Sequence, residues 1–202
     1  MKKKIVVATK NPGKVREMMN AFQNLPVELL PLSAFGDLPE AVEDGKTFAE
    51  NAAIKARFYM RETGTACLAD DSGLSVDALD GAPGVYSARF AGWHADDAAN
   101  NEKLLAELRR LGLAESAAAY HCALAFCDTD GVIVTAHGTC PGVVRLTAKG
   151  SGGFGYDPYF YLDNGRSMAE LSLAEKDAVS HRGAALREMA ELLSFQFEGW
   201  EE

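Results

Sequence analysis

The residues most able to do chemistry are two adjacent aspartates, Asp70 and Asp71, which follow the apolar run 66–69. That run is typical of a short buried strand. Because strand side chains alternate between faces, we expect one of the two carboxylates to face a site. Carboxylate oxygens suit Mg²⁺, which binds through one or two carboxylates together with substrate phosphates. Glu43, in an acidic run, is the candidate second carboxylate. The alternatives are an Asx-type turn at Asp71 and a solvated surface position for Glu43.

A second set of polar residues lies in a loop between a strand-like run and a helical pattern. The loop offers hydroxyl, amide and ammonium donors that suit a phosphate, although it lacks the spacing of a P-loop or of a dinucleotide-binding loop. The predicted substrate-binding set takes in the whole loop: Thr9, Lys10, Asn11, Pro12, Gly13 and Lys14.

Two helix starts carry cations. Lys14 opens one predicted helix, and His181 and Arg182 open another after Ser180. A cation opposes the positive end of the helix macrodipole unless an anion binds there as well. We therefore interpret both helix starts as anion sites, with a merely tolerated, solvated cation as the alternative.

A further helix is predicted to begin at the capping box Thr47–Glu50, which gives Glu50 a structural explanation. Asn51 and Lys55 lie four residues apart on one face of that helix. Small alanines beside them would leave room for a ligand, and a solvent-exposed face is the plain alternative.

The loop 152–158 concentrates glycines around Phe154, Tyr156 and Asp157. Aromatic side chains on such a loop can stack on a nucleic-acid base. An aspartate there can accept hydrogen bonds from ring N–H groups of the base. The alternative is that both aromatic rings pack into the core.

Composition narrows the classes of partner. The 202 residues carry 20 Lys and Arg against 29 Asp and Glu, a net charge of −9. Such a chain would be repelled by polymeric DNA or RNA, whose phosphates are neutralised by Lys and Arg. No run approaches the roughly 20 apolar residues of a membrane span. The cysteines form no CxxC pair, so we expect buried free thiols and a reduced, cytoplasmic protein.

The elements that must position these residues alternate between strand and helix. A parallel strand–helix–strand unit opens the chain, and a hairpin turns at 128–131. This order predicts an α/β fold with a mixed sheet flanked by helices, in a single domain over residues 1–202. The expected strands are 4–9, 27–32, 66–69, 120–127, 132–137 and 143–146, and the expected helices are 14–24, 47–63, 97–111 and 181–195.

Taken together, the motifs resemble those of the inosine triphosphate pyrophosphatase family, the XTP/dITP diphosphatases, and its bacterial branch in particular. The similarity spans almost the whole chain in the family's order, and the combination is highly specific. The matching stretches are 8–14, 47–52 with 55–56, 69–74, 81–89, 152–158, 169–171, 175–176 and 180–182.

This resemblance implies an elongated mixed sheet, two lobes with a central active-site cleft, and a homodimer. It implies Mg²⁺-dependent hydrolysis of ITP, dITP and XTP to the monophosphate and pyrophosphate, which removes deaminated purines from the nucleotide pool. A pyrophosphatase for pyrimidine or modified nucleotides, and a nucleotide sensor without turnover, are the rival readings. Intact Asp70 and Asp71 argue against the sensor.

The resemblance also implies roles for individual residues. Thr9, Asn11 and Lys14 would contact the phosphates with Lys55 nearby, whereas Lys10 receives no role of its own. Asp71 would be the general base or the metal-linked carboxylate, with Glu43 as a metal ligand and Ser72 as a substrate contact. The base would stack on Phe154 in a pocket completed by Gly155, Tyr156, Asp157, Lys176, His181 and Arg182.

Overall fold

The computed structural model of the chain describes residues 2–92 and 96–198. The chain folds as two compact units. The first comprises residues 1–71, 122–138 and 182–202, and the second comprises residues 72–121 and 139–181. Three strands, β3, β4 and β5, contribute residues to both units. That the chain forms one domain with a central cleft stays a prediction.

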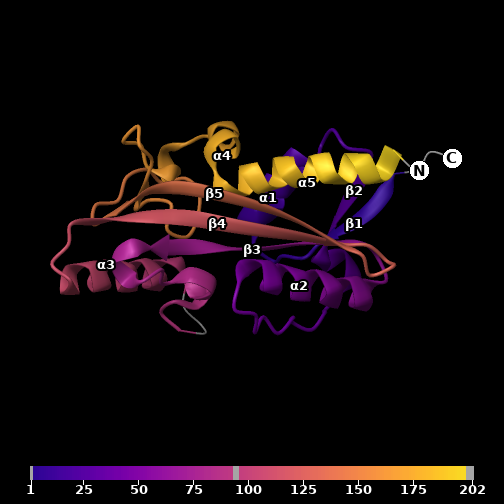
Figure 1. Cartoon of the computed structure of the whole chain (residues 1–202), viewed down its shortest axis with the longest axis horizontal. Helices are drawn as coiled ribbons and strands as arrows, with labels where there is room; N and C mark the ends of the chain where they lie inside the picture. The colour runs from indigo at the N-terminus through magenta and orange to yellow at the C-terminus, as the bar shows by residue number, and fades with distance from the viewer. Residues whose placement is uncertain (1, 93–95, 199–202) are drawn as a thin grey trace. The chain divides into compact units, whose positions relative to one another are not determined.

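The predicted α/β fold with a mixed sheet is confirmed. The strand order is β2-β1-β3-β4-β5-β6, and Figure 1 labels the first five of these strands in chain order. β1 runs parallel to both β2 and β3, whereas β5 and β6 are antiparallel. The strands are β1 Lys3–Val7, β2 Val27–Pro31, β3 Cys67–Val76, β4 Glu115–Cys127, β5 Ile133–Arg145 and β6 Phe160–Tyr161.

Local signals fix several helix ends. The Asn11 side chain caps the start of α1, and the predicted capping box between Thr47 and Glu50 opens α2. Gly64 ends α2 in the left-handed conformation, at φ 61°, which glycine adopts without strain. The helices are α1 Pro12–Ala21, α2 Phe48–Thr63, α3 Asp97–Arg110, α4 Leu173–Val179 and α5 His181–Glu198. None of these described helices has the length and apolarity needed to cross a membrane.

In the first unit the sheet is covered on both faces, because alternate residues of each strand are buried on opposite sides. Ile5 and Val7 of β1 belong to a core with Met18 of α1 and Leu186 of α5. Val6, between them in the chain, belongs to the core under α2. Figure 1 shows α1 and α5 on one side of these strands and α2 on the other.

The second unit has its own core. Leu104 and Leu108, one turn apart on α3, pack with Leu74 of β3 and Tyr120 of β4. The 3-10 helix Gly84–Arg89 is held against β3 by Ser87. The Ser87 hydroxyl accepts a hydrogen bond from the Leu74 backbone N–H at 2.9 Å.

Three sequence expectations were wrong in detail. The aspartates do not end a strand: β3 continues through Ser72 and Gly73 to Val76, since these residues pair within the sheet instead of turning. The segment 143–146 is the end of one long strand, β5. The first helix begins at Pro12 and ends at Ala21, because proline is favoured in a first helical turn. All four cysteines are buried free thiols, as expected.

Candidate active site

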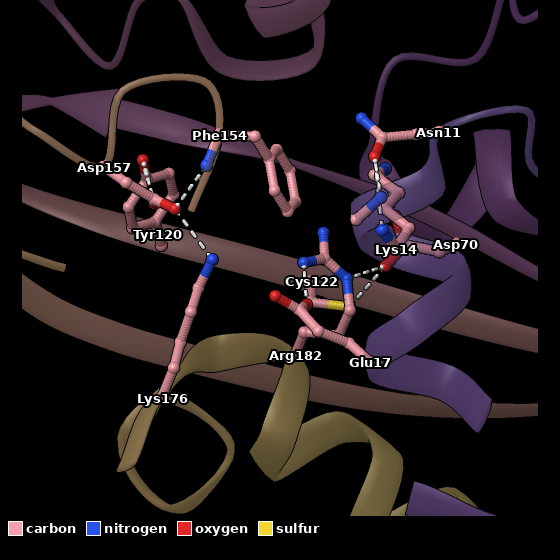
Figure 2. Close-up of polar contacts among 11 residues, drawn as sticks. Asn11, Lys14, Glu17, Asp70, Tyr120, Cys122, Phe154, Asp157, Lys176 and Arg182 are labelled. Carbon is pink, nitrogen blue, oxygen red and sulfur yellow. Dashed lines mark hydrogen bonds and ion pairs between the residues drawn. The ribbon is translucent and has the colours of Figure 1, made fainter. Parts of the chain in front are cut away.

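Asp70 lies at the centre of a buried polar cluster in the first unit (Figure 2). Its carboxylate is fully buried and accepts hydrogen bonds from the Lys14 ammonium and, at 2.8 Å, from Arg182 Nε. The Cys122 thiol donates to the same carboxylate at 3.2 Å. The Asp70 cluster, as we name it, consists of Lys14, Glu17, Asp70, Cys122 and Arg182.

The cluster balances its own charge. Arg182 is 2% exposed and also donates from Nη1 to Glu17 at 2.6 Å, so two cations face two carboxylates. Burial by itself would raise the pKa of Asp70, but Arg182 and Lys14 hold that pKa well below its usual range. Burial and the neighbouring Asp70 charge raise the pKa of the Cys122 thiol, which is therefore an unreactive donor.

Asp71 has quite different surroundings. Its Oδ2 is buried and has no hydrogen-bond partner among the described residues. Burial raises the pKa of Asp71 to about 6, although Lys55, Lys14 and a hydrogen bond with Asn51 act in the opposite direction. A buried carboxylate oxygen without a donor costs free energy unless a cation or a proton donor completes it. Asp71 is thus the carboxylate that is available to a bound cation, water molecule or substrate.

The surroundings of Asp71 fit a divalent cation shared with phosphates. The unpartnered Oδ2 is one candidate ligand, and Glu43 is close enough to influence the pKa of Asp71. The residues described here hold no group of three or more His, Cys, Asp or Glu suited to a metal ion. Mg²⁺ needs no such group, because it retains waters and takes further oxygens from substrate phosphates.

Lys55 connects Glu43 to the aspartates. Its ammonium lies 2.8 Å from Glu43 Oε2 and donates to the backbone carbonyl of Asp70 at 3.1 Å. Glu43 is therefore not the solvated surface acid of the plain alternative. Lys55 would therefore compete with a metal ion for the Glu43 carboxylate.

Hydrogen bonds between its own residues hold the loop at 9–14. Asn11 Oδ1 accepts from the backbone N–H groups of Gly13 and Lys14, at 2.8 and 3.2 Å. Thr9 Oγ1 in turn accepts from the Asn11 backbone N–H at 3.1 Å. The two cations diverge: Lys14 reaches Asp70, whereas Lys10 makes an exposed ion pair with Glu40 at 3.0 Å. Only Lys14 of this loop joins the buried cluster.

The second unit has a polar cluster centred on Asp157 (Figure 2). Asp157 Oδ2 accepts from Lys176 Nζ at 2.7 Å and from the Phe154 backbone N–H at 2.9 Å. The Tyr120 hydroxyl donates to Oδ1 at 3.2 Å. Lys176 Nζ also lies 4.5 Å from the centroid of the Phe154 ring. We name these four residues the Asp157 cluster.

The two aromatic residues of the glycine-rich loop differ in burial. Tyr156 is buried in the core, and its hydroxyl donates to the Ser87 carbonyl at 2.7 Å, as the packing alternative would have it. Phe154 is only half-buried. His181 stacks on Tyr120, with ring centroids 4.6 Å apart and planes inclined by 11°. Ser72 lies half-buried within β3.

Three members of these clusters escaped the sequence analysis. Glu17 follows Lys14 by three residues and so shares its face of α1. Tyr120 and Cys122 are two residues apart on β4, so both point to one face of the sheet. Helical periodicity could have placed Glu17 beside Lys14, whereas Tyr120 and Cys122 reach Asp157 and Asp70 through tertiary contacts that the sequence does not show.

Comparisons with known proteins identify the family of the chain. A model of the Ham1 family matches residues 5–192. The chain belongs to the Ham1 family. It is 51% identical over 194 residues to a dITP/XTP pyrophosphatase of Geobacter sulfurreducens, covering 96% of this chain and 98% of that protein. The resemblance drawn from the motifs is thereby confirmed.

Two further relatives support the assignment. A dITP/XTP pyrophosphatase of Bacillus anthracis is 48% identical over 200 residues, covering 98% of this chain and 99% of that protein. The solved structure of a HAM1 protein from Coxiella burnetii superposes with a TM-score of 0.86 at 39% identity, covering 95% of this chain and 98% of that one. Sequence and fold therefore point to the same family.

Proposed function

We propose that this protein hydrolyses dITP, ITP and XTP to the monophosphate and pyrophosphate, as the names of its relatives indicate for them. The observation that carries the proposal is the buried, unpartnered Oδ2 of Asp71 beside the cations Lys14 and Lys55. Such an oxygen can orient a water molecule, while the ammonium groups stabilise negative charge on phosphates. Phosphoryl transfer depends mainly on this kind of positioning and charge stabilisation.

The first unit supplies the groups for the triphosphate. Lys14 and Lys55 would stabilise the departing pyrophosphate, with Thr9 and Asn11 as further contacts. Asp70 accepts from Lys14 through its carboxylate and from Lys55 through its backbone carbonyl, so both ammonium groups are held before substrate arrives. Such preorganisation avoids reorientation of the charges during the reaction. Asp71 is the residue that would orient the water attacking the α-phosphorus.

Mg²⁺ is the proposed cofactor, and Asp71 and Glu43 are the residues that would hold it. Bound Mg²⁺ supplies charge neutralisation to the phosphate oxygens of the substrate. The Glu43–Lys55 ion pair is partly buried, so Mg²⁺ held by Glu43 would share that carboxylate with Lys55.

The second unit supplies the groups for the purine. The base would stack on the half-buried Phe154, and Lys176 and His181 lie close to the rings of that cluster. Hydrogen-bond donors of the protein that face a 6-oxo group would reject adenine. Adenine has an amino group at that position, so donor would face donor and both would be buried without an acceptor. The resemblance also assigns Arg182 to the base, but Arg182 belongs to the first unit, where Asp70 and Glu17 fix the direction of its guanidinium.

The experiment is pyrophosphate release from dITP, ITP, XTP, GTP and ATP, with Mg²⁺ and with EDTA. Metal-dependent release from the deaminated purines, with GTP and ATP far slower, would support the proposal. Binding of ITP without release would instead indicate a nucleotide sensor. Preference for a pyrimidine triphosphate would indicate a different house-cleaning enzyme.

The partner and the compartment are proposed on coarser grounds. We propose a homodimer, which the motif resemblance implies. We also propose the cytoplasm, where nucleotide pools lie and where the four free thiols would stay reduced. Mass measurement in solution and cell fractionation test these two points.

A further inference from the structure

Both backbone polar groups of Gly155 are held by side chains of one helix. The Gly155 N–H donates to Asp97 Oδ2 at 2.7 Å, and its carbonyl accepts from Asn101 Nδ2 at 2.9 Å. Asp97 begins α3 and Asn101 follows one turn later, so the two side chains project from the same face. A helix of the second unit thus holds the peptide groups on both sides of one residue of the glycine-rich loop.

The gripped residue directly follows Phe154. Gly153 and Gly155 on either side of Phe154 have φ of +70° and +62°, conformations that glycine adopts freely but also leaves freely. Behind the ring, the Phe154 N–H is held by Asp157. Ahead of it, the backbone is held by Asp97 and Asn101. The ring therefore sits between two fixed points in an otherwise permissive loop.

Asn101 is an unusual choice if its role were stability alone. It is 8% exposed, and its Oδ1 is buried without a hydrogen-bond partner among the described residues. An amide half satisfied in this way is costly, and an apolar residue of similar size would avoid that cost. Among the described residues, the hydrogen bond to Gly155 is the one interaction of the Asn101 amide, so its role lies at the loop.

We infer that Asp97 and Asn101 are positioning residues that fix the ring of Phe154 for the base of the substrate. The inference rests on the proposed function, because it takes Phe154 as the base-stacking residue. Neither residue needs to touch the nucleotide. Their effect should fall on the affinity for the base and leave the affinity for phosphate groups unchanged.

The test compares Asn101→Ala with Asn100→Ala in the full-length protein. Asn100 is a matched control: it is buried on the same helix, but its amide binds the backbone of Ala88 and Ala91 instead of the loop. The readouts are KM and kcat for ITP, and the inhibition constants of IMP and of inorganic pyrophosphate. Phe154→Ala is measured in parallel.

For Asn101→Ala we expect KM for ITP and the inhibition constant of IMP to rise about tenfold, with kcat and the pyrophosphate constant unchanged. Asp97→Ala should behave alike, whereas Asp97→Asn should restore affinity because it keeps an acceptor oxygen. Asn101→Leu should lose base affinity without a lower melting temperature, which a purely structural role would not allow.

Two results would overturn the inference. If Asn101→Ala matches Asn100→Ala while Phe154→Ala weakens IMP, the base site stands and the positioning role is wrong. If Phe154→Ala leaves the IMP constant unchanged, the base-stacking role in the proposed function fails, and the positioning role fails with it.

Discussion

The Asp70 cluster and the Asp157 cluster each surround a buried aspartate, yet they satisfy it differently. Asp70 is bound by two cations, Lys14 and Arg182, which come from α1 and α5. Asp157 is bound by one cation, Lys176, and by two neutral donors, one of them a backbone N–H. The first arrangement fixes charged side chains in place, and the second fixes the course of a loop.

This difference suits two ends of a nucleotide. A triphosphate calls for ammonium and guanidinium groups at fixed positions, because its charge is spread over many oxygens. A purine calls for a flat surface at a fixed angle, which depends on backbone more than on charge. The following variants are ordered by the size of the effect we expect, and each alters one cluster or its neighbour.

The largest effect should come from Asp71→Asn, which changes the carboxylate beside the Asp70 cluster and leaves that cluster intact. We expect kcat for ITP to fall by about a thousandfold, as for loss of a group that orients or deprotonates water. The thermal midpoint should stay near that of the parent, because Oδ2 has no partner to lose and asparagine keeps an oxygen that can accept from Asn51. Pyrophosphate release and a melting curve check both points, and near-normal turnover would remove Asp71 from the mechanism.

Arg182→Ala should mainly cost stability. Its removal leaves Asp70 and Glu17 as buried carboxylates without their guanidinium partner, which typically costs about 3–5 kcal/mol. Urea unfolding measures the loss. The control is Arg187→Ala on the exposed face of the same helix, for which we expect less than about 1 kcal/mol. Equal losses for the two variants would show that the cluster is not the ionic anchor we describe.

Phe154→Ala should weaken the base end alone. Stacking of a base on an aromatic ring contributes about 1–3 kcal/mol, so KM for ITP should rise roughly tenfold or more. Phe154→Tyr keeps the ring and serves as the control, with KM close to that of the parent. Steady-state kinetics with ITP decide the matter, and an unchanged KM for Phe154→Ala would exclude stacking on this residue.

The smallest effect should separate the two clusters by their neutral donors. Tyr120→Phe removes a hydroxyl bond to Asp157 and should cost about 1 kcal/mol of unfolding free energy. Cys122→Ala removes only a weak thiol donor from Asp70, which keeps both cations. Chemical denaturation should therefore show a larger loss of stability for Tyr120→Phe than for Cys122→Ala. Steady-state kinetics should show a higher KM for ITP in Tyr120→Phe alone. A higher KM from Cys122→Ala would reverse the comparison.

Much of this molecule could be predicted from local patterns. Strand–helix alternation predicted the sheet class, and the capping box Thr47–Glu50 predicted the start of α2. These signals act over a few residues, so sequence shows them directly. The predicted end of β3 was wrong because Asp70-Asp71-Ser72-Gly73 is a turn-like sequence. In the structure, pairing with neighbouring strands outweighs this local preference.

The site residues show the same limit. The motifs pointed to Lys14, Asp70 and Arg182, but not to their common bond network, which joins residues 112 positions apart. Nor could spacing show that Asp71, and not Asp70, has the unpartnered oxygen. Which carboxylate is already satisfied depends on tertiary contacts, and these have no local signature.

The most direct test of the division between the two clusters uses ligands that carry one end of the substrate each. Lys55, which donates to the Asp70 carbonyl, represents the neighbourhood of the Asp70 cluster. Inhibition of ITP hydrolysis by inosine and by pyrophosphate is measured for the parent, Lys55→Met and Phe154→Ala. We predict that Lys55→Met weakens pyrophosphate about tenfold and leaves inosine unchanged, and that Phe154→Ala does the reverse. If either variant weakens both ligands alike, the assignment of phosphate and base to separate clusters is contradicted.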